Sequence, residues 1–160
     1  MTLELLVGAF QLLLSWFGEL KGTSRAAFRK RVRSHLRLIY FHQEGVLGIL
    51  QKVAKGQHVS GDEWRNVMTD FDGHGPQIEA ALTEIYEAAK DLDERFAIAD
   101  LNVLRDIANG KLELRQSLRH KLDLIRDNPP EFDGGVSELV SEILKFNEAV
   151  ETLDKELTHG

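Results

Sequence analysis

The sequence predicts an all-α protein: an antiparallel bundle of four long helices plus an apolar N-terminal helix and one short connecting helix. Apolar residues recur at steps of three and four along most of the chain, which is the spacing of helices packed along a seam. No stretch shows the alternation of apolar and polar residues that is typical of a strand. Pro76 follows Gly75, and the pair Pro129-Pro130 follows Asn128, so the three prolines are expected to separate helices. With 160 residues, the chain suits a single domain spanning 1–160, of which 23–160 form the bundle.

The N-terminal helix, residues 1–22, contains the almost unbroken apolar stretch Leu3 to Leu20. Its polar and small residues, from Glu4 through Glu19, recur at steps of three or four and form one narrow stripe. We therefore expect a helix that is largely buried, in its own bundle or in an oligomer, in preference to a membrane-contacting or membrane-spanning helix. An arm exchanged with another chain is an alternative. The candidate interaction residues are Leu6, Phe10, Leu13, Trp16 and Phe17.

The second predicted helix runs from Thr23 to Lys55 and has an apolar seam at steps of four and three. His35 and His42 fall on this seam, so both are expected to point into the bundle. Gly45 and Gly48 either let a neighbouring segment approach closely or mark a kink.

A short helix is predicted after the turn from Gly56 to Gly61. Ser60 followed by Glu63 fits a capping box, and the residues from Asp70 to Gly75 are expected to end this helix after about three turns. Pro76 would then be the first residue of the next helix.

Two further long helices complete the predicted bundle. The first runs from about Asp100 to Asp127, continuing through Asn109-Gly110 because its apolar register persists on both sides. The last has the most regular heptad pattern in the chain, between Val136 and Leu157.

The chain contains no cysteine, which excludes disulfides, thiolate metal sites and cysteine nucleophiles and is compatible with a reducing cytoplasm. Charge is unevenly distributed. Residues 1–56 contain nine basic and three acidic residues, a net charge of +6, so the remainder carries −12 of the total of −6. Such asymmetry can indicate an anionic partner for the basic part. We favour self-neutralisation, in which the basic helix lies along acidic helices of the same chain.

The most informative group of charged residues is an arginine row, which consists of Arg25, Arg29, Arg33 and Arg37. Because the residues are four apart, they lie along one edge of a helix over about 18 Å, a geometry that suits a layer of anionic head groups or a phosphate backbone. Membrane-surface contact is the better functional interpretation, since an apolar helix directly precedes the row, and a solvated face paired with Asp and Glu of later helices is the structural alternative. The candidate anion-binding residues are Arg25, Arg29, Lys30, Arg33 and Arg37.

Neither metal nor cofactor binding is predicted. The Glu-x-x-His spacing of carboxylate-bridged di-metal bundles is absent, so His35 and His42 are interpreted as hydrogen-bonded core residues. The run from Asp70 to Gly75 begins like a calcium loop, but Ala81 stands where a bidentate glutamate belongs, so we interpret it as a turn.

One hexapeptide carries an enzymatic alternative. Arg115-Gln-Ser-Leu-Arg-His120 resembles the catalytic signature of HEPN ribonucleases, which are small all-helical domains. The resemblance implies that Arg115 and His120 act on an RNA backbone, usually across a dimer. A solvated helix face is the structural alternative for these six residues.

The sequence as a whole predicts a non-enzymatic helical interaction protein, without cofactors, that is oligomeric or a subunit of a larger assembly. Its expected partner is a second copy or another helical protein, with anionic membrane-surface contact through the N-terminal helix and the arginine row. We expect it in the cytoplasm, or peripherally at the inner face of a membrane. The alternatives are the ribonuclease and a nucleic-acid-binding module.

Overall fold

The computed structural model describes residues 2–19, 22–92, 104–106, 109, 114–127 and 133–159. Within these ranges the regular structure is helical and no strand is present, which confirms the all-α class. The described helices are α1 (Thr2–Glu19), α2 (Gly22–Ile39), α3 (Val46–Ala54), α4 (Gly61–Leu92), α7 (Leu114–Asp127) and α8 (Asp133–His159).

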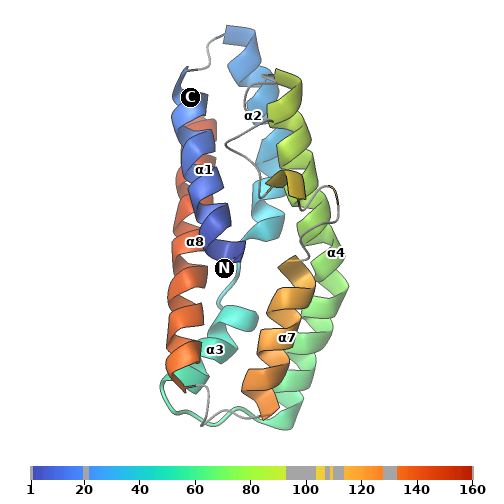
Figure 1. Cartoon of the computed structure of the whole chain (residues 1–160), viewed down its shortest axis with the longest axis vertical. Coiled ribbons are helices and arrows are strands. Elements are labelled where there is room, and N and C mark those ends of the chain that lie inside the picture. The colour runs from blue at the N-terminus through green and yellow to red at the C-terminus, as the bar shows by residue number, and fades with distance from the viewer. Residues whose placement is uncertain are drawn as a thin grey trace.

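Two long helices, α4 and α8, extend along the whole bundle and run in the same direction (Figure 1). A third column runs the opposite way and consists of α2 in the upper half and α3 in the lower half. The shorter α1 packs against α8, and α7 packs against α4. The long helices thus hold together an upper half containing α1 and α2 and a lower half containing α3 and α7.

The apolar face of α1 is buried within the chain. Phe10 makes an edge-to-face contact with Phe146 of α8, with ring centroids 5.7 Å apart. At the other end of the helix, the Phe17 and Phe28 rings are 5.8 Å apart, which joins α1 to α2. The polar stripe lies on the opposite side, because Glu4, Gln11 and Ser15 are exposed. The helix is therefore amphipathic with a wide apolar face, as its stripe predicts, and no described helix is long and apolar enough to cross a bilayer.

The predicted continuous helix from Thr23 to Lys55 is wrong, because the chain leaves the helix after Ile39 and resumes it only at Val46. Asn147 of α8 fixes this break: its side-chain carbonyl accepts from the Phe41 amide at 2.9 Å, and its amide donates to the Phe41 carbonyl at 2.8 Å. Gly48 is required next to the break, since a Cβ there would collide with the backbone carbonyl of Gln43. Both sequence expectations for the glycines therefore apply, a change of direction and a close approach.

The predicted short helix ending near Gly75 is also wrong, because α4 continues through Pro76 to Leu92. Proline removes one backbone hydrogen bond from a helix interior, so tertiary packing must compensate. Phe71 and Gly75 are buried, and the Arg115 side chain of α7 lies where a Cβ on Gly75 would be. Packing on one continuous face thus outweighs the local tendency of Gly73, Gly75 and Pro76 to end the helix.

The junction between α3 and α4 follows the sequence prediction. Gly56 ends α3 in the left-handed region with φ of 72°, which favours glycine. The capping box is present: the Ser60 hydroxyl accepts from the Glu63 amide at 3.1 Å and donates to its carboxylate at 3.4 Å. Lys52 reaches the same carboxylate at 2.8 Å, and these hydrogen bonds, that to Lys52 first, lower the pKa of Glu63.

Of the last two predicted helices, the first is wrong in its extent and the second is confirmed. The proposed start at Asp100 lies outside the described residues, but Asn109 is in a turn and α7 begins at Leu114, so a single helix through Asn109 is wrong. The heptad seam of α8 is confirmed throughout, since all its apolar positions are buried. They are Val136, Leu139, Ile143, Phe146, Val150, Leu153 and Leu157.

Candidate anion-binding surface

The exposed edge of α2 carries a shallow, open depression of about 440 Å³. It lies on the side of the helix away from the core, because the residues that α2 buries are Phe28, Val32, Leu36 and Ile39. Steps of three and four place its lining side chains together on one edge. The lining residues are Arg29, Lys30, Arg33, Ser34 and Arg37.

The four cations of this depression have no acidic partner in the part of the chain that the structure describes. Arg31, which projects from another side of α2, differs sharply. Its guanidinium contacts Glu84 at 2.5 Å and Asp91 at 2.6 Å, both on α4, and hydrogen bonds to Asp91 and then Glu84 raise its pKa. Self-neutralisation between α2 and α4 therefore occurs at Arg31 but does not extend to the depression.

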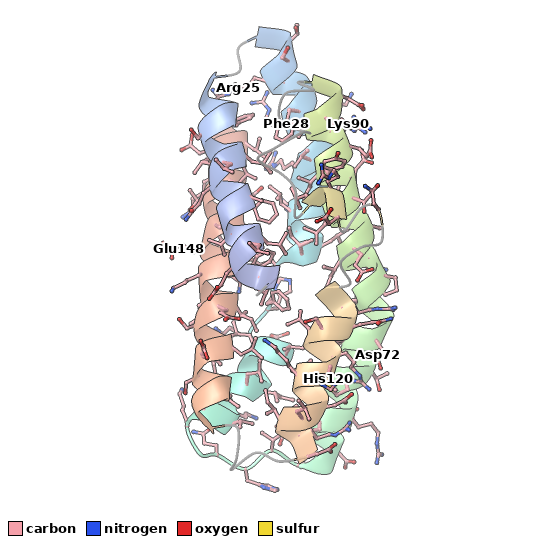
Figure 2. All side chains as sticks on the ribbon, viewed as in Figure 1. Arg25, Phe28, Asp72, Lys90, His120 and Glu148 are labelled. Carbon is pink, nitrogen blue, oxygen red and sulfur yellow. The ribbon has the colours of Figure 1, made fainter. Side chains whose placement is uncertain are left out.

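Arg25, the first arginine of the predicted row, is placed differently from the other three. Its guanidinium lies over the Phe17 ring at 4.3 Å from the centroid, a cation–π contact between α2 and α1. Figure 2 shows Arg25 near Phe28 at the end of the bundle where α1 leads into α2. The anion-binding candidates thus reduce to Arg29, Lys30, Arg33 and Arg37, with Ser34 added as a neighbour that the charge pattern could not reveal.

The uncompensated cations have an energetic consequence. Like charges four residues apart on a helix destabilise it by roughly 0.2–0.5 kcal/mol per pair. Arg29, Arg33 and Arg37 form two such pairs on the exposed edge. A bound anion would relieve this repulsion, so the geometry is suited to anion binding.

Four of the five candidate interaction residues of α1 belong to the core of this chain. Leu6, Phe10, Leu13 and Phe17 are each no more than 1% exposed, and the Trp16 side chain lies outside the described residues. Contact of these four side chains with a partner would require α1 to leave α8. The large apolar side chains that α1 does expose are Leu5 at 56% and Leu12 at 41%, among its described residues.

The two histidines of α2 and its following loop are not both interior, contrary to expectation. His42 is exposed and lies against Tyr40, with ring centroids 5.3 Å apart. His35 is half-buried, and its Nδ1 is buried without a hydrogen-bond partner. Across the described ranges, no group of three His, Asp or Glu side chains could hold a metal ion. The segment that begins like a calcium loop is part of the continuous helix α4.

Arg115 and His120 lie on different sides of α7. The Arg115 side chain packs over Gly75 of α4, and its backbone amide donates to the Glu79 carboxylate at 3.1 Å. His120 is exposed and lies at a groove shared with α8 (Figure 2). Five residues correspond to about 140° of rotation around a helix, so a single protomer does not bring these two side chains together.

Comparisons with protein-family models, with curated proteins and with solved structures find no match to this chain.

Proposed function

We propose that this protein is a non-enzymatic helical interaction protein that docks on an anionic lipid surface through the exposed edge of α2. The observation that supports the proposal is the depression formed by Arg29, Lys30, Arg33 and Arg37, whose cations lack acidic partners among the described residues. Each Lys or Arg near an anionic membrane surface contributes about 1 kcal/mol. Four of them favour the bound state by roughly 4 kcal/mol, or about a thousandfold, in low salt.

Three features favour a lipid surface over nucleic acid. Leu38, 48% exposed, follows directly after Arg37 and would meet the interfacial region of a bilayer once the cations contact head groups. The depression has no aromatic lining residue, whereas sites for single-stranded nucleic acid stack bases on aromatic side chains. The edge from Arg29 to Arg37 is also only about 12 Å long. A nucleic acid longer than this edge would extend beyond it over the acidic helices, which repel its phosphates.

Vesicle sedimentation tests the proposal. Phosphatidylcholine vesicles with phosphatidylserine should retain the wild type, and pure phosphatidylcholine vesicles should not. Replacing Arg29, Arg33 and Arg37 by Gln should abolish retention. Raising the salt concentration should weaken wild-type binding, because exposed charges are screened.

A charge-matched control separates a local site from a general charge effect. Arg65, Lys145 and Lys155 are exposed on α4 and α8, so their triple Gln variant has the same net charge as the α2 variant. The control should bind vesicles like the wild type. Equal loss in both variants would refute a site on α2, and tighter binding of RNA or duplex DNA than of vesicles through the same residues would replace the lipid by nucleic acid.

The proposal includes self-association or assembly with another helical protein, supported by the exposed apolar positions of α1. Leu5 and Leu12 are one heptad apart, the spacing of a helix–helix seam. Light scattering with and without detergent should show an oligomer that the double variant Leu5→Ser, Leu12→Ser dissociates. A wild-type monomer at all concentrations and without detergent dependence would refute this part.

A further inference from the structure

A second concave site lies in the lower half of the molecule, between α7 and α8. It is a groove of about 280 Å³, at the small end of ligand-binding cavities. Its apolar lining comes from Leu124 and Ile125 of α7 and Leu139 of α8. Because α7 packs on α4, the groove is left between α7 and the neighbouring part of α8.

The distinctive group in this groove is the carboxylate of Glu142. Glu142 is 8% exposed, and its Oε2 is buried without a hydrogen-bond partner. Burial raises the pKa of this carboxyl, because the charged form loses hydration. A buried carboxylate without a hydrogen bond is costly, so the fold retains here a group that a ligand can satisfy.

The remaining polar lining determines the sign of charge that the groove accepts. Glu138, one turn before Glu142 on α8, adds a second carboxylate at the rim. Lys121 of α7 provides one positive charge that partly offsets Glu142, while the negative potential of Glu4 of α1 is opposed by the N-terminal ammonium group. His120 completes the rim. Two carboxylates against one ammonium give the acidic and basic lining residues a net negative charge, which favours a cation.

We propose that the groove binds a small organic cation with an apolar body, whose ammonium group pairs with Glu142. The body would contact Leu124, Ile125 and Leu139, and the ammonium would pair with the Glu142 carboxylate where this residue lines the groove. A metal ion does not fit this position, since no metal-binding group of three His, Asp or Glu occurs in the described part of the chain. The ligand class is an aliphatic or arylalkyl amine, protonated at neutral pH.

Binding of phenethylammonium tests this assignment, with neutral 2-phenylethanol as its uncharged analogue. Methyl NMR should show shifts for the Leu124, Ile125 and Leu139 methyl groups on titration with phenethylammonium. The cation should bind about tenfold or more tightly than the alcohol, the range for a hydrogen bond to a charged group.

Two variants make the test specific. Glu142→Gln keeps the size and shape of the side chain. This variant should bind the cation and the alcohol about equally tightly, while the methyl resonances of the groove still shift on titration. Glu148→Gln is the matched control, because Glu148 is exposed elsewhere on α8, and it should leave the preference unchanged. An undiminished preference in Glu142→Gln, shifts confined to other methyl groups, or no shift at millimolar cation would overturn the proposal.

Discussion

Replacing Asn147 should be one of the most damaging single polar substitutions in this protein. The side chain is 4% exposed and satisfies both the amide and the carbonyl of Phe41, which is itself 7% exposed. Asn147→Ala removes both partners at once. A buried backbone group left without a hydrogen bond costs about 1–3 kcal/mol, so two of them cost roughly 2–6 kcal/mol.

Two refinements sharpen this magnitude. Alanine leaves space for a water molecule that can partly replace the amide, whereas Asn147→Leu fills that space with apolar atoms and keeps water out. The Leu variant should therefore lose more stability than the Ala variant. Alanine is also the better helix former by several tenths of a kcal/mol, a gain that offsets part of the loss.

Denaturation in urea measures the effect, with Asn66→Ala as a control. Asn66 is exposed in α4, so its replacement gains the same helix propensity without losing a buried hydrogen bond. The midpoint of Asn147→Ala should fall by about 1–2 M relative to this control, taking a urea dependence of about 2.5 kcal/mol per M. Hydrogen exchange at the Phe41 amide should accelerate as well. A difference below about 1 kcal/mol between the two variants would refute the role assigned to Asn147.

The remaining predictions concern single positions and use the same denaturation assay. Ser60→Ala should lower the free energy of unfolding by about 1 kcal/mol through loss of the α4 cap, and an unchanged value would contradict the capping box. Gly48→Ala should lower the free energy of unfolding by about 1–3 kcal/mol, because the new Cβ meets the Gln43 carbonyl. Gly73→Ala, with open space around the glycine, should raise the free energy of unfolding by about 0.5–1 kcal/mol. Equal effects of the two substitutions would contradict the geometry. Glu142 has a raised pKa, so the folded state binds its proton more tightly and stability falls as pH rises above the ordinary glutamate range. Glu142→Gln should therefore stabilise the protein at neutral pH and have little effect below pH ~4, and the opposite pH trend would exclude burial as the cause.

Apolar periodicity predicted the buried faces well because burial of a helix face depends on spacing alone. All seven seam positions of α8 from Val136 to Leu157 are buried, and the polar stripe residues Glu4, Gln11 and Ser15 of α1 are exposed. The class of the fold follows from these patterns without knowledge of which helix meets which.

Helix boundaries were predicted less well, because glycine and proline only change the local cost of a helix. In the loop before Gly45 the chain is not helical, and Asn147 satisfies the amide and the carbonyl of Phe41 there. At Pro76 the same kind of local cost is outweighed by packing against α7. The partner helix decides each case, and in the sequence Asn147 lies far from Gly45, as Arg115 does from Pro76.

The charged residues of the candidate sites can be recognised in the sequence, but their partners come from distant parts of the chain and cannot. The arginine row is visible in the sequence, but whether a cation of α2 has an acidic partner depends on where α4 lies. Arg31 and Arg33 are only two residues apart, yet about 200° of rotation separates them around α2. Arg31 therefore reaches Glu84 and Asp91 whereas Arg33 faces outward. The groove at Glu142 could not be predicted, because Glu138 and Glu142 look like ordinary exposed charges until α7 is placed beside them.

The interruption between α2 and α3 explains why sites of opposite charge coexist in one small bundle. An unbroken helix from Thr23 to Lys55 would carry one seam along the full length of α8. With the break held at Asn147, α2 packs against α4 and α8, while the shorter α3 follows in the lower half, with α7 on α4. Nine residues of α3 bury one side of the lower part of α8, and the side of α8 toward α7 keeps the groove at Glu142. The cationic edge of α2 thus belongs to the upper half and the anionic groove between α7 and α8 to the lower half.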